Sequence, residues 1–285
     1  MLPPWIALDP ILRGWLLEDI GRGDRTTAPL FQSQALAGKA KWVAKESGVI
    51  AGQAIAARVF KLLNEKVGFH AKVADGEAVE QGQLTALLEG PLDALLTGER
   101  VALNLTMRLS GIATLTHKYV EQIADLQAKL VDTRKTTPGL RALEKYATHV
   151  GGAVNHRMGL DDGVMIKDNH IAAAGGIGRA IAGIRAAMPY PLTIEVETES
   201  LEQVREALQH QADIIMLDNM SLVIMKQAVA LIRGTNDRIK IEASGNITLE
   251  TIRSVAETGV DYISSSAPVT RSTWLDLSMR LTNTV

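Results

Sequence analysis

The spacing of hydrophobic residues differs between the first and second parts of the chain. Over residues 37–50 apolar and polar positions partly alternate, which predicts strands, and residues 52–64 have helical spacing. Residues 72–91 contain two more strand-like pieces that are separated by glycine turns. These elements predict a small α+β domain over residues 1–110.

Two helices are predicted at the ends of this region. The first begins at Asp9-Pro10 and stops at Gly21, because Asp and Pro favour helix starts and glycine favours helix ends. The second covers residues 98–127, where Gly111 is expected to break or kink it.

After residue 127, short apolar runs alternate with amphipathic helices such as 200–209 and 221–233. The runs cover residues 129–135, 163–169, 192–198, 213–219, 239–245 and 261–266. Nearly all-apolar strands with helices between them indicate a parallel sheet that is buried on both faces. Six such units, with a candidate seventh strand at 153–157, are enough to close or nearly close a βα barrel. No G-x-G-x-x-G motif follows a strand, which counts against a dinucleotide-binding fold.

Each predicted strand ends in polar or charged side chains. They are Asp132, Arg134 and Lys135; Lys167, Asp168 and Asn169; Glu195 and Glu197; Asp218 and Asn219; Glu242, Ser244 and Gly245; and Ser264, Ser265 and Ser266. The carboxyl ends of the strands in a parallel barrel meet on one face, and active sites lie there. The sequence therefore predicts an active site at this face.

Several bases are predicted at strand ends or in the adjoining loops, namely Arg134, Lys135, Arg157 and Lys167. Arg141 and Lys145 fall on a following helix and are expected at its surface. A guanidinium group binds a carboxylate or a phosphate through two parallel hydrogen bonds. The cluster therefore predicts an anionic ligand.

Carboxylates at other strand ends, Glu197 and Asp218, suggest a hard cation as well. Mg²⁺ is usually held by one or two carboxylates together with substrate oxygens. Two turns, at residues 243–246 and 264–268, follow the last two strands. Barrels commonly bind phosphate at this position through backbone N–H groups. We therefore expect a phosphorylated substrate with Mg²⁺.

The composition excludes several classes of protein. The 285 residues carry a formal net charge of −2, so no overall positive field attracts nucleic acid or an anionic membrane. The absence of cysteine excludes disulfides, thiolate metal sites and cysteine nucleophiles. No apolar run reaches the ~20 residues that span a bilayer, and MLPPWIALDP lacks the basic and apolar regions of a signal peptide. We therefore expect a cytoplasmic protein.

The chain resembles the quinolinate phosphoribosyltransferase (decarboxylating nicotinate-nucleotide pyrophosphorylase) family over nearly its whole length. The motifs that carry the resemblance are GERVALNLTMRLSGIAT (98–114), DTRKTTPGLRALEKYA (132–147), GGAVNHRMGLDDGVMIKDNHI (151–171), IEVE (194–197), IMLDN (215–219) and EASGNI (242–247). The resemblance implies an α/β protein with an N-terminal α/β sandwich domain, residues 1–110, and a seven-stranded βα barrel, residues 111–269. A C-terminal helix at about 270–285 is expected to pack back on the first domain.

The same resemblance implies the reaction and the assembly. Quinolinate and phosphoribosyl pyrophosphate, with Mg²⁺, would give nicotinate mononucleotide, pyrophosphate and CO₂, a step of de novo NAD biosynthesis. The family is at least a homodimer whose active sites are completed across the interface. No nucleic acid or membrane partner is expected.

The family's roles are carried over to matching positions. The residues that would clamp the two quinolinate carboxylates are Arg134, His156, Arg157 and Lys167, with Thr133 beside them and Arg100 supplied by the partner subunit. The predicted catalytic residues are Lys135 at the phosphoribosyl donor, and Glu197 and Asp218 at the ribose hydroxyls and the metal. The predicted phosphate contacts are Ser244, Gly245 and Asn246, and then Ser265, Ser266 and Ala267. This last turn departs from the family pattern, because Ser266 replaces a common glycine and Pro268 cannot donate a backbone N–H.

Three other functions remain open at this stage. Lys167 at a strand end could form a Schiff base, as in βα-barrel aldolases. A molybdate-operon relative or another non-catalytic binding protein could keep the same fold. A structural interaction protein would have no need of charges that converge at strand ends.

Overall fold

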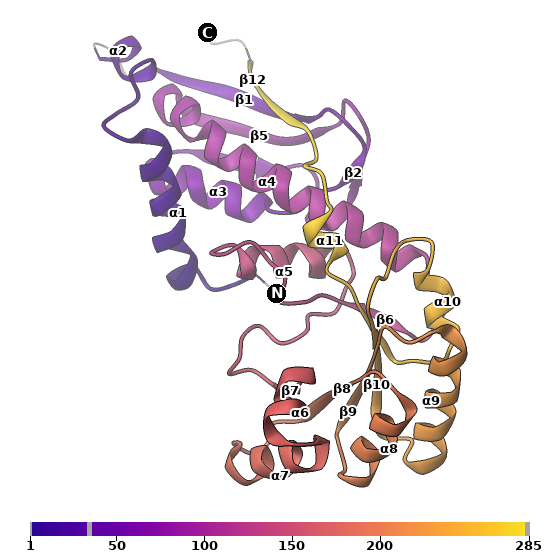
Figure 1. Ribbon diagram of the computed structural model, residues 1–285. Helices are drawn as coiled ribbons and strands as arrows, with labels where there is room; N and C mark the ends of the chain where they lie inside the picture. The colour runs from indigo at the N-terminus through magenta and orange to yellow at the C-terminus, as the bar shows by residue number, and fades with distance from the viewer. Residues whose placement is uncertain (1, 33–35, 283–285) are drawn as a thin grey trace. The chain divides into compact units, whose positions relative to one another are not determined.

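The computed structural model describes residues 2–32 and 36–282, and the chain forms two compact units (Figure 1). The first unit contains the residues up to 117, residues 142–152 and the residues from 271 onward. The second contains residues 118–141 and 153–270. In the described ranges, no helix is both long enough and apolar enough to cross a bilayer.

The first unit is built on an antiparallel sheet with the strand order β12-β1-β5-β3. Its strands are β1 (Ala37–Ala44), β3 (Gly68–Ala71), β5 (Leu84–Pro91) and β12 (Leu277–Thr282), and a separate pair consists of β2 (Gly48–Val49) and β4 (Ala78–Val79). The helices are α1 (Trp5–Ile20), α2 (Thr27–Leu30), α3 (Gln53–Leu63), the part of α4 (Leu92–Glu121) up to residue 117, and nearly all of α5 (Arg141–Val150). Trp42 of β1 and Phe60 of α3 are fully buried, with ring centroids 6.3 Å apart, so the sheet and α3 share one core.

The predicted C-terminal helix at about 270–285 is wrong, because this segment forms strand β12. It pairs antiparallel with β1 from Lys39↔Thr282 to Ala44↔Leu277. The sequence LSMRLT alternates apolar and polar residues with a period of two, which favours a strand. The segment does return to the first unit, as expected, and residues 283–285 lie outside the described range.

Two helices of the first unit also differ from the prediction. Helix α1 begins at Trp5, and Pro10 lies inside it. Helix α4 runs unbroken through Gly111. A Cβ atom on Gly111 would lie 1.8 Å from the carbonyl oxygen of Thr273, so this glycine allows the returning chain to approach the helix closely.

Helix α5 packs in the first unit, although the predicted division at residue 110 placed it in the barrel domain. Arg108 of α4 donates to Glu144 at 2.8 Å, and Tyr146 donates to Asp75 at 2.5 Å. The expectation that Lys145 lies at the surface is wrong, since its side chain is fully buried.

The second unit contains a parallel sheet with the strand order β6-β11-β10-β9-β8-β7. Its strands are β6 (Lys129–Val131), β7 (Val164–Ile166), β8 (Ile194–Thr198), β9 (Ile214–Asp218), β10 (Lys240–Ser244) and β11 (Tyr262–Ser264). Its helices are α6 (Asp168–Ala174), α7 (Ile177–Ala187), α8 (Leu201–Gln209), α9 (Leu222–Thr235), α10 (Ile252–Ala256) and α11 (Ala267–Thr270). All six apolar runs therefore form strands, as predicted, and the predicted helices at 200–209 and 221–233 correspond to α8 and α9.

The candidate seventh strand at 153–157 is reduced to one bridge, between Val154 and Val131 of β6. Beyond it, the backbone N–H of His156 donates to the carboxylate of Asp132 at 2.8 Å instead of to a carbonyl of β6. The sheet of the second unit thus has six strands within the described residues, and the predicted count of seven is wrong.

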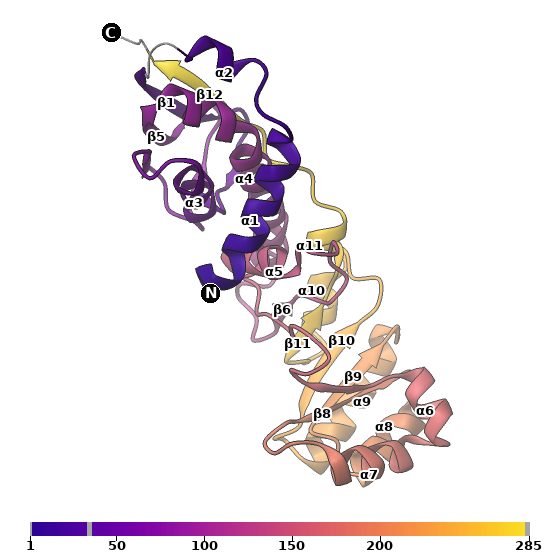
Figure 2. The same cartoon turned by 90° about the vertical axis from the view of Figure 1, so that its left-hand side faces the viewer.

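The two faces of this sheet have different chemistry, because side chains alternate along each strand. One face carries Ile194, Val196, Ile215, Leu217 and Ile241, all fully buried. Helix α7 packs against β7, helix α8 packs against β8, and helix α9 packs against α8 (Figures 1 and 2). The other face carries most of the charged strand residues and positions the candidate site.

Candidate active site

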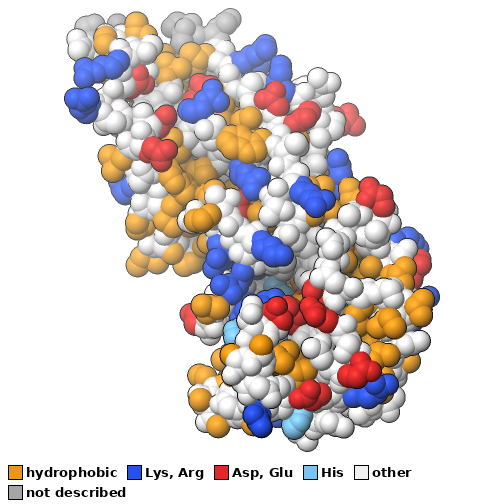
Figure 3. All heavy atoms as spheres, in the orientation of Figure 1, with side chains coloured by type: hydrophobic (Ala, Val, Ile, Leu, Met, Phe, Trp, Pro, Cys, Tyr) orange, Lys and Arg blue, Asp and Glu red, His pale blue; other side chains and the backbone are white. Residues whose placement is uncertain are grey.

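Carboxylates from neighbouring strands share one face of the parallel sheet. Strand register places Glu197 of β8 level with Met216 of β9, and Met216 level with Glu242 of β10. Glu195 and Asp218 lie on the same face, since each is two residues from one of these positions. The sheet itself therefore gathers four carboxylates on one face. On the side drawn in Figure 3, acidic and basic side chains are interspersed over the molecule, in agreement with the small net charge.

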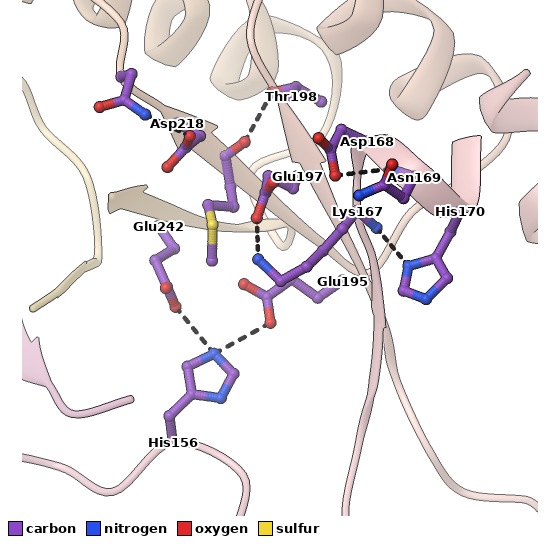
Figure 4. Close-up of polar contacts among 12 residues, drawn as sticks. His156, Lys167, Asp168, Asn169, His170, Glu195, Glu197, Thr198, Asp218 and Glu242 are labelled. Carbon is purple, nitrogen blue, oxygen red and sulfur yellow. Dashed lines mark hydrogen bonds and ion pairs between the residues drawn. The ribbon is translucent and has the colours of Figure 1, made fainter. Parts of the chain in front are cut away.

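His156 lies between two of these carboxylates (Figure 4). Its Nε2 atom is 3.1 Å from Glu195 Oε2 and 3.4 Å from Glu242 Oε2. Both glutamates are 3% exposed, and the second oxygen of each has no hydrogen-bond partner among the described residues. The Nδ1 atom of His156 accepts the backbone N–H of Arg157 at 2.8 Å. The ring is therefore held from both sides.

This cluster of His156, Glu195 and Glu242 retains an extra proton at neutral pH. Burial raises the pKa of Glu195. Burial alone would lower the pKa of His156, but hydrogen bonds to the two glutamates raise it to about 10.

Asp132 connects the end of β6 to the segment that carries His156. It is 2% exposed, and its carboxylate accepts the side chain of Asn155 at 2.6 Å and the backbone of His156 at 2.8 Å. Arg157 follows and donates to the carbonyl of Gly163 at 2.7 Å. A buried carboxylate at the end of β6 thus fixes the backbone from which two predicted substrate-binding side chains extend.

Two of the predicted clamp residues, Arg134 and Arg157, influence each other electrostatically. Burial and the charge of Arg134 lower the pKa of Arg157. Arg134 Nε is buried and has no hydrogen-bond partner in the described part of the chain. Two adjacent guanidinium groups with unused donor capacity favour a bound anion.

Lys167 follows β7, and its amine forms an ion pair with Glu197 of β8 (Figure 4). The backbone N–H of Lys167 donates to Nδ1 of His170 at 3.0 Å, which caps the first turn of α6. An amine paired with a carboxylate is not in the apolar pocket or beside the second cation that activates a Schiff-base lysine. The geometry therefore gives the aldolase alternative no support.

The turn after β10 has a backbone that few residues adopt. Gly245 has φ +96° and Asn246 has φ +52°. Asn246 tolerates this conformation better than most residues, and glycine tolerates it at no cost. The predicted phosphate turn, Ser244 to Asn246, lies directly beside Asp218, which is paired with Ser244 in the sheet register.

In the turn after β11, two of the backbone N–H groups already donate to protein atoms. The N–H of Ser265 donates to the carbonyl of Val131 at 3.1 Å, and the N–H of Ala267 donates to the hydroxyl of Ser265 at 3.2 Å. Pro268 has no N–H to add. Among the predicted contacts in this turn, the hydroxyl and N–H of Ser266 donate to no residue that the structure describes.

The remaining predicted residues are placed as follows. Thr133 and Lys135 follow β6; Lys135 is exposed, and its backbone N–H donates to the hydroxyl of Thr133 at 3.0 Å. Arg100 lies on α4 in the first unit and is exposed. Except for Arg100, every predicted site residue therefore belongs to the second unit.

Two sets of carboxylates can be considered for a metal. His156, Glu195 and Glu242 offer three ligand atoms within 4.8 Å of one another, the only such group among the described residues. One oxygen of each glutamate already faces Nε2 of His156, and the charge of the cluster is offset by a proton. Glu197 and Asp218 offer hard carboxylate oxygens at the strand ends, the donor type that Mg²⁺ prefers.

The sequence interpretation placed Glu195, Glu242, Asp132 and Asn219 at the predicted active-site face but gave none of them a role in the site. Glu195 and Glu242 carried a usable signal, because a glutamate inside a nearly all-apolar strand must be paired when it is buried. Asp132 and Asn219 stood at strand ends, but their partners become visible only in three dimensions.

Known proteins are similar to this chain over nearly its whole length. The family described as "Quinolinate phosphoribosyl transferase, N-terminal domain" matches residues 24–110, and the C-terminal domain of the same family matches residues 112–280. A probable nicotinate-nucleotide pyrophosphorylase (carboxylating) from Synechocystis is 59% identical over 280 residues, which are 98% of this chain and 94% of that protein. A protein of the same description from Bacillus subtilis is 48% identical over 97% of this chain and 94% of its own length.

Solved structures give the same result for the fold. The crystal structure of NadC from Streptococcus pyogenes has a TM-score of 0.93 and 44% identity, and 99% of each chain is covered. The nicotinate-nucleotide pyrophosphorylase from Francisella tularensis has a TM-score of 0.91 and 36% identity, with 98% of each chain covered.

Proposed function

The chain belongs to the quinolinate phosphoribosyltransferase family, and we propose that it transfers the phosphoribosyl group of phosphoribosyl pyrophosphate to quinolinate. The products are nicotinate mononucleotide, pyrophosphate and CO₂, so the enzyme acts in de novo NAD biosynthesis. Relatives named for this activity match 98% of the chain, which supports the assignment of the whole reaction.

The observation that carries the proposal is the pair Arg134 and Arg157. Their charges repel each other, and Arg134 Nε is buried without a partner within the described ranges. A ligand with two adjacent carboxylates satisfies both guanidinium groups at once. With Lys167 at the next strand end, the bases suit the quinolinate dianion.

The carboxylates complete the chemistry. Quinolinate and the donor are both anionic and repel each other in water, so the bases must neutralise and align them. The bond from ribose C1 to pyrophosphate breaks, the pyridine nitrogen bonds to C1, and positive charge develops on the ribose ring. Glu197 and Asp218 stabilise that charge electrostatically. When CO₂ departs, the electron pair stays on the adjacent ring carbon, where the cationic ring nitrogen stabilises it, and that carbon takes up a proton.

Mg²⁺ belongs to the same proposal. When bound, it offsets the charge of the leaving pyrophosphate. Asp218 accepts the side-chain N–H of Asn219 at Oδ2, so Oδ1 is left for the metal or the ribose hydroxyls. Glu197 becomes available for the same role when the substrate carboxylates replace it as the partner of Lys167.

The assembly and the closure of the barrel are proposed as well. Arg100 is exposed on the first unit, which suits an arginine that completes the site of a partner subunit in a homodimer or larger oligomer. Val154 pairs with β6 at one edge of the sheet, and the chain then leads to β7 at the other edge, so we propose that this segment closes a barrel. A cytoplasmic location is part of the same proposal, and the 59% identity to a bacterial relative supports it.

The test is direct. The purified protein is incubated with quinolinate, phosphoribosyl pyrophosphate and Mg²⁺, and the mononucleotide, pyrophosphate and CO₂ are measured. We expect the three products in equal amounts, no CO₂ without the donor, and loss of turnover when a chelator removes Mg²⁺. Folded protein that releases neither CO₂ nor mononucleotide would overturn the proposed function, and full activity in chelator would remove the metal from it.

A further inference from the structure

Asn219 connects two parts of the site that the sequence interpretation treated separately. It directly follows β9 with φ +53°, a conformation that non-glycine residues seldom adopt. Its backbone N–H donates to the carbonyl of Ser244, the last residue of β10, at 3.0 Å. The strained backbone thus turns the side chain toward the neighbouring strand end.

Both ends of the Asn219 side chain are engaged. Nδ2 donates to Oδ2 of Asp218 at 2.6 Å, and Oδ1 accepts from Nδ2 of Asn246 at 3.1 Å. The amide orientation follows from these two partners, because a flipped amide would place Oδ1 against the carboxylate. One side chain therefore joins the carboxylate after β9 to the turn after β10.

Gly245 makes this contact possible. A Cβ atom on Gly245 would lie 2.2 Å from Oδ1 of Asn219, which no real Cβ tolerates. The amide of Asn219 thus lies directly on the Cα of Gly245. The glycine is required by its φ of +96° and also by this close approach.

We propose that Asn219 is a positioning residue for the phosphoribosyl donor, which sets the Asp218 carboxylate and the backbone of the 244–246 turn at a fixed separation. This inference rests on the proposed function. The carboxylate would bind the ribose hydroxyls and the turn would bind a phosphate of the same donor. A fixed separation therefore lowers the entropy cost of binding both ends. Asn219 acts through its neighbours and has no need to touch the donor itself.

The test compares the two substrates in Asn219→Gly, which keeps the left-handed backbone and removes the side chain. We expect the KM for phosphoribosyl pyrophosphate to rise by about 10-fold or more, from the loss of two hydrogen bonds. The dissociation constant of quinolinate should stay within about twofold, because the quinolinate clamp lies on other strands. A general structural role would shift both constants together.

Three further variants sharpen the test. Asn219→Asp keeps the shape of the side chain but places a charge against Asp218, so it should weaken donor binding more than Asn219→Gly. Asn246→Gly removes the same hydrogen bond to Oδ1 of Asn219 by changing the donor instead of the acceptor. It replaces Asn219→Gly in the test if that variant fails to fold. Asn236→Gly is the matched control. The Oδ1 atom of Asn236 also accepts a hydrogen bond, from the backbone N–H of Arg238 at 3.1 Å, but Asn236 precedes β10 at the opposite end of the strand.

Direct binding separates this inference from the proposed function. Calorimetric titration with phosphoribosyl pyrophosphate and Mg²⁺ reports donor affinity without turnover. A wild-type protein that binds the donor while Asn219→Gly and Asn246→Gly bind it equally well would overturn the positioning role. A wild-type protein that binds neither substrate would instead overturn the proposed function and this inference with it.

Discussion

Lys167 and Glu197 form an ion pair between the carboxyl ends of adjacent strands β7 and β8. The family resemblance gives them different partners, since Lys167 would bind quinolinate and Glu197 would face the ribose and the metal. Each one neutralises the other. Under the proposed function, substrate binding would exchange this pair for contacts with two ligands.

Glu197→Gln should separate these two roles. Without its carboxylate partner, Lys167 is free for the dianion, and the pair is partly exposed, so we expect quinolinate to bind about two- to fivefold more tightly. Turnover should fall by about 100-fold, because the charge that stabilises the ribose cation is lost. Calorimetry and steady-state kinetics measure the two effects. Weaker quinolinate binding would contradict the exchange.

Arg134→Ala should weaken quinolinate binding by roughly 1.5–3 kcal/mol, the range for a lost hydrogen bond to a charged group. The effect should exceed that of an ordinary surface arginine, because Arg134 Nε is buried without a partner within the described ranges. Arg205→Ala, an arginine 55% exposed on α8, is the matched control. Equal quinolinate dissociation constants in Arg134→Ala and wild type would remove Arg134 from the clamp.

Arg100→Ala should be inactive alone and active in a mixture. If Arg100 completes the site of a partner subunit, a mixed dimer with Glu197→Gln contains one site with both residues intact. We expect partial activity after the two variants are unfolded and refolded together, at up to about a quarter of wild type by random pairing. Mixed dimers that are confirmed by mass spectrometry and remain inactive would contradict a shared site.

The sequence predicted the strands of the second unit because each is a short apolar run, and a run of this kind has few other structures available. It also predicted the polar end of the sheet, because the residues after each run are polar in every case. Strand β12 was missed although LSMRLT alternates regularly. Its partner β1 is far away in the sequence, and an isolated strand of six residues gives a weak signal.

The contacts within the site could not be predicted from the sequence, for a different physical reason. The grouping of His156 with Glu195 and Glu242 depends on sheet register and on the carboxylate of Asp132, which redirects the backbone after Val154. The role of Asn219 depends on a positive φ next to a glycine that leaves room for it. Pattern and spacing do not encode which strand ends become neighbours.

The buried cluster of His156, Glu195 and Glu242 predicts how stability changes with pH. The pKa of His156 is raised from 6.5 to about 10, and burial also raises the pKa of Glu195, so both shifts make the folded chain bind more protons than the unfolded chain. The free energy of unfolding should then fall as the pH rises from 6.5 to about 10, and the contribution of His156 should be complete below 6.5.

Glu242→Gln tests this pH dependence, because it removes one of the two carboxylates that hold the extra proton. Urea unfolding at several pH values across this window should show a smaller loss of stability with pH in Glu242→Gln than in wild type. Glu199→Gln, at an exposed position just after β8, is the matched control and should keep the wild-type slope. Equal slopes in wild type and Glu242→Gln would mean that the cluster releases its proton below this range, and that the two carboxylates are then both charged beside His156.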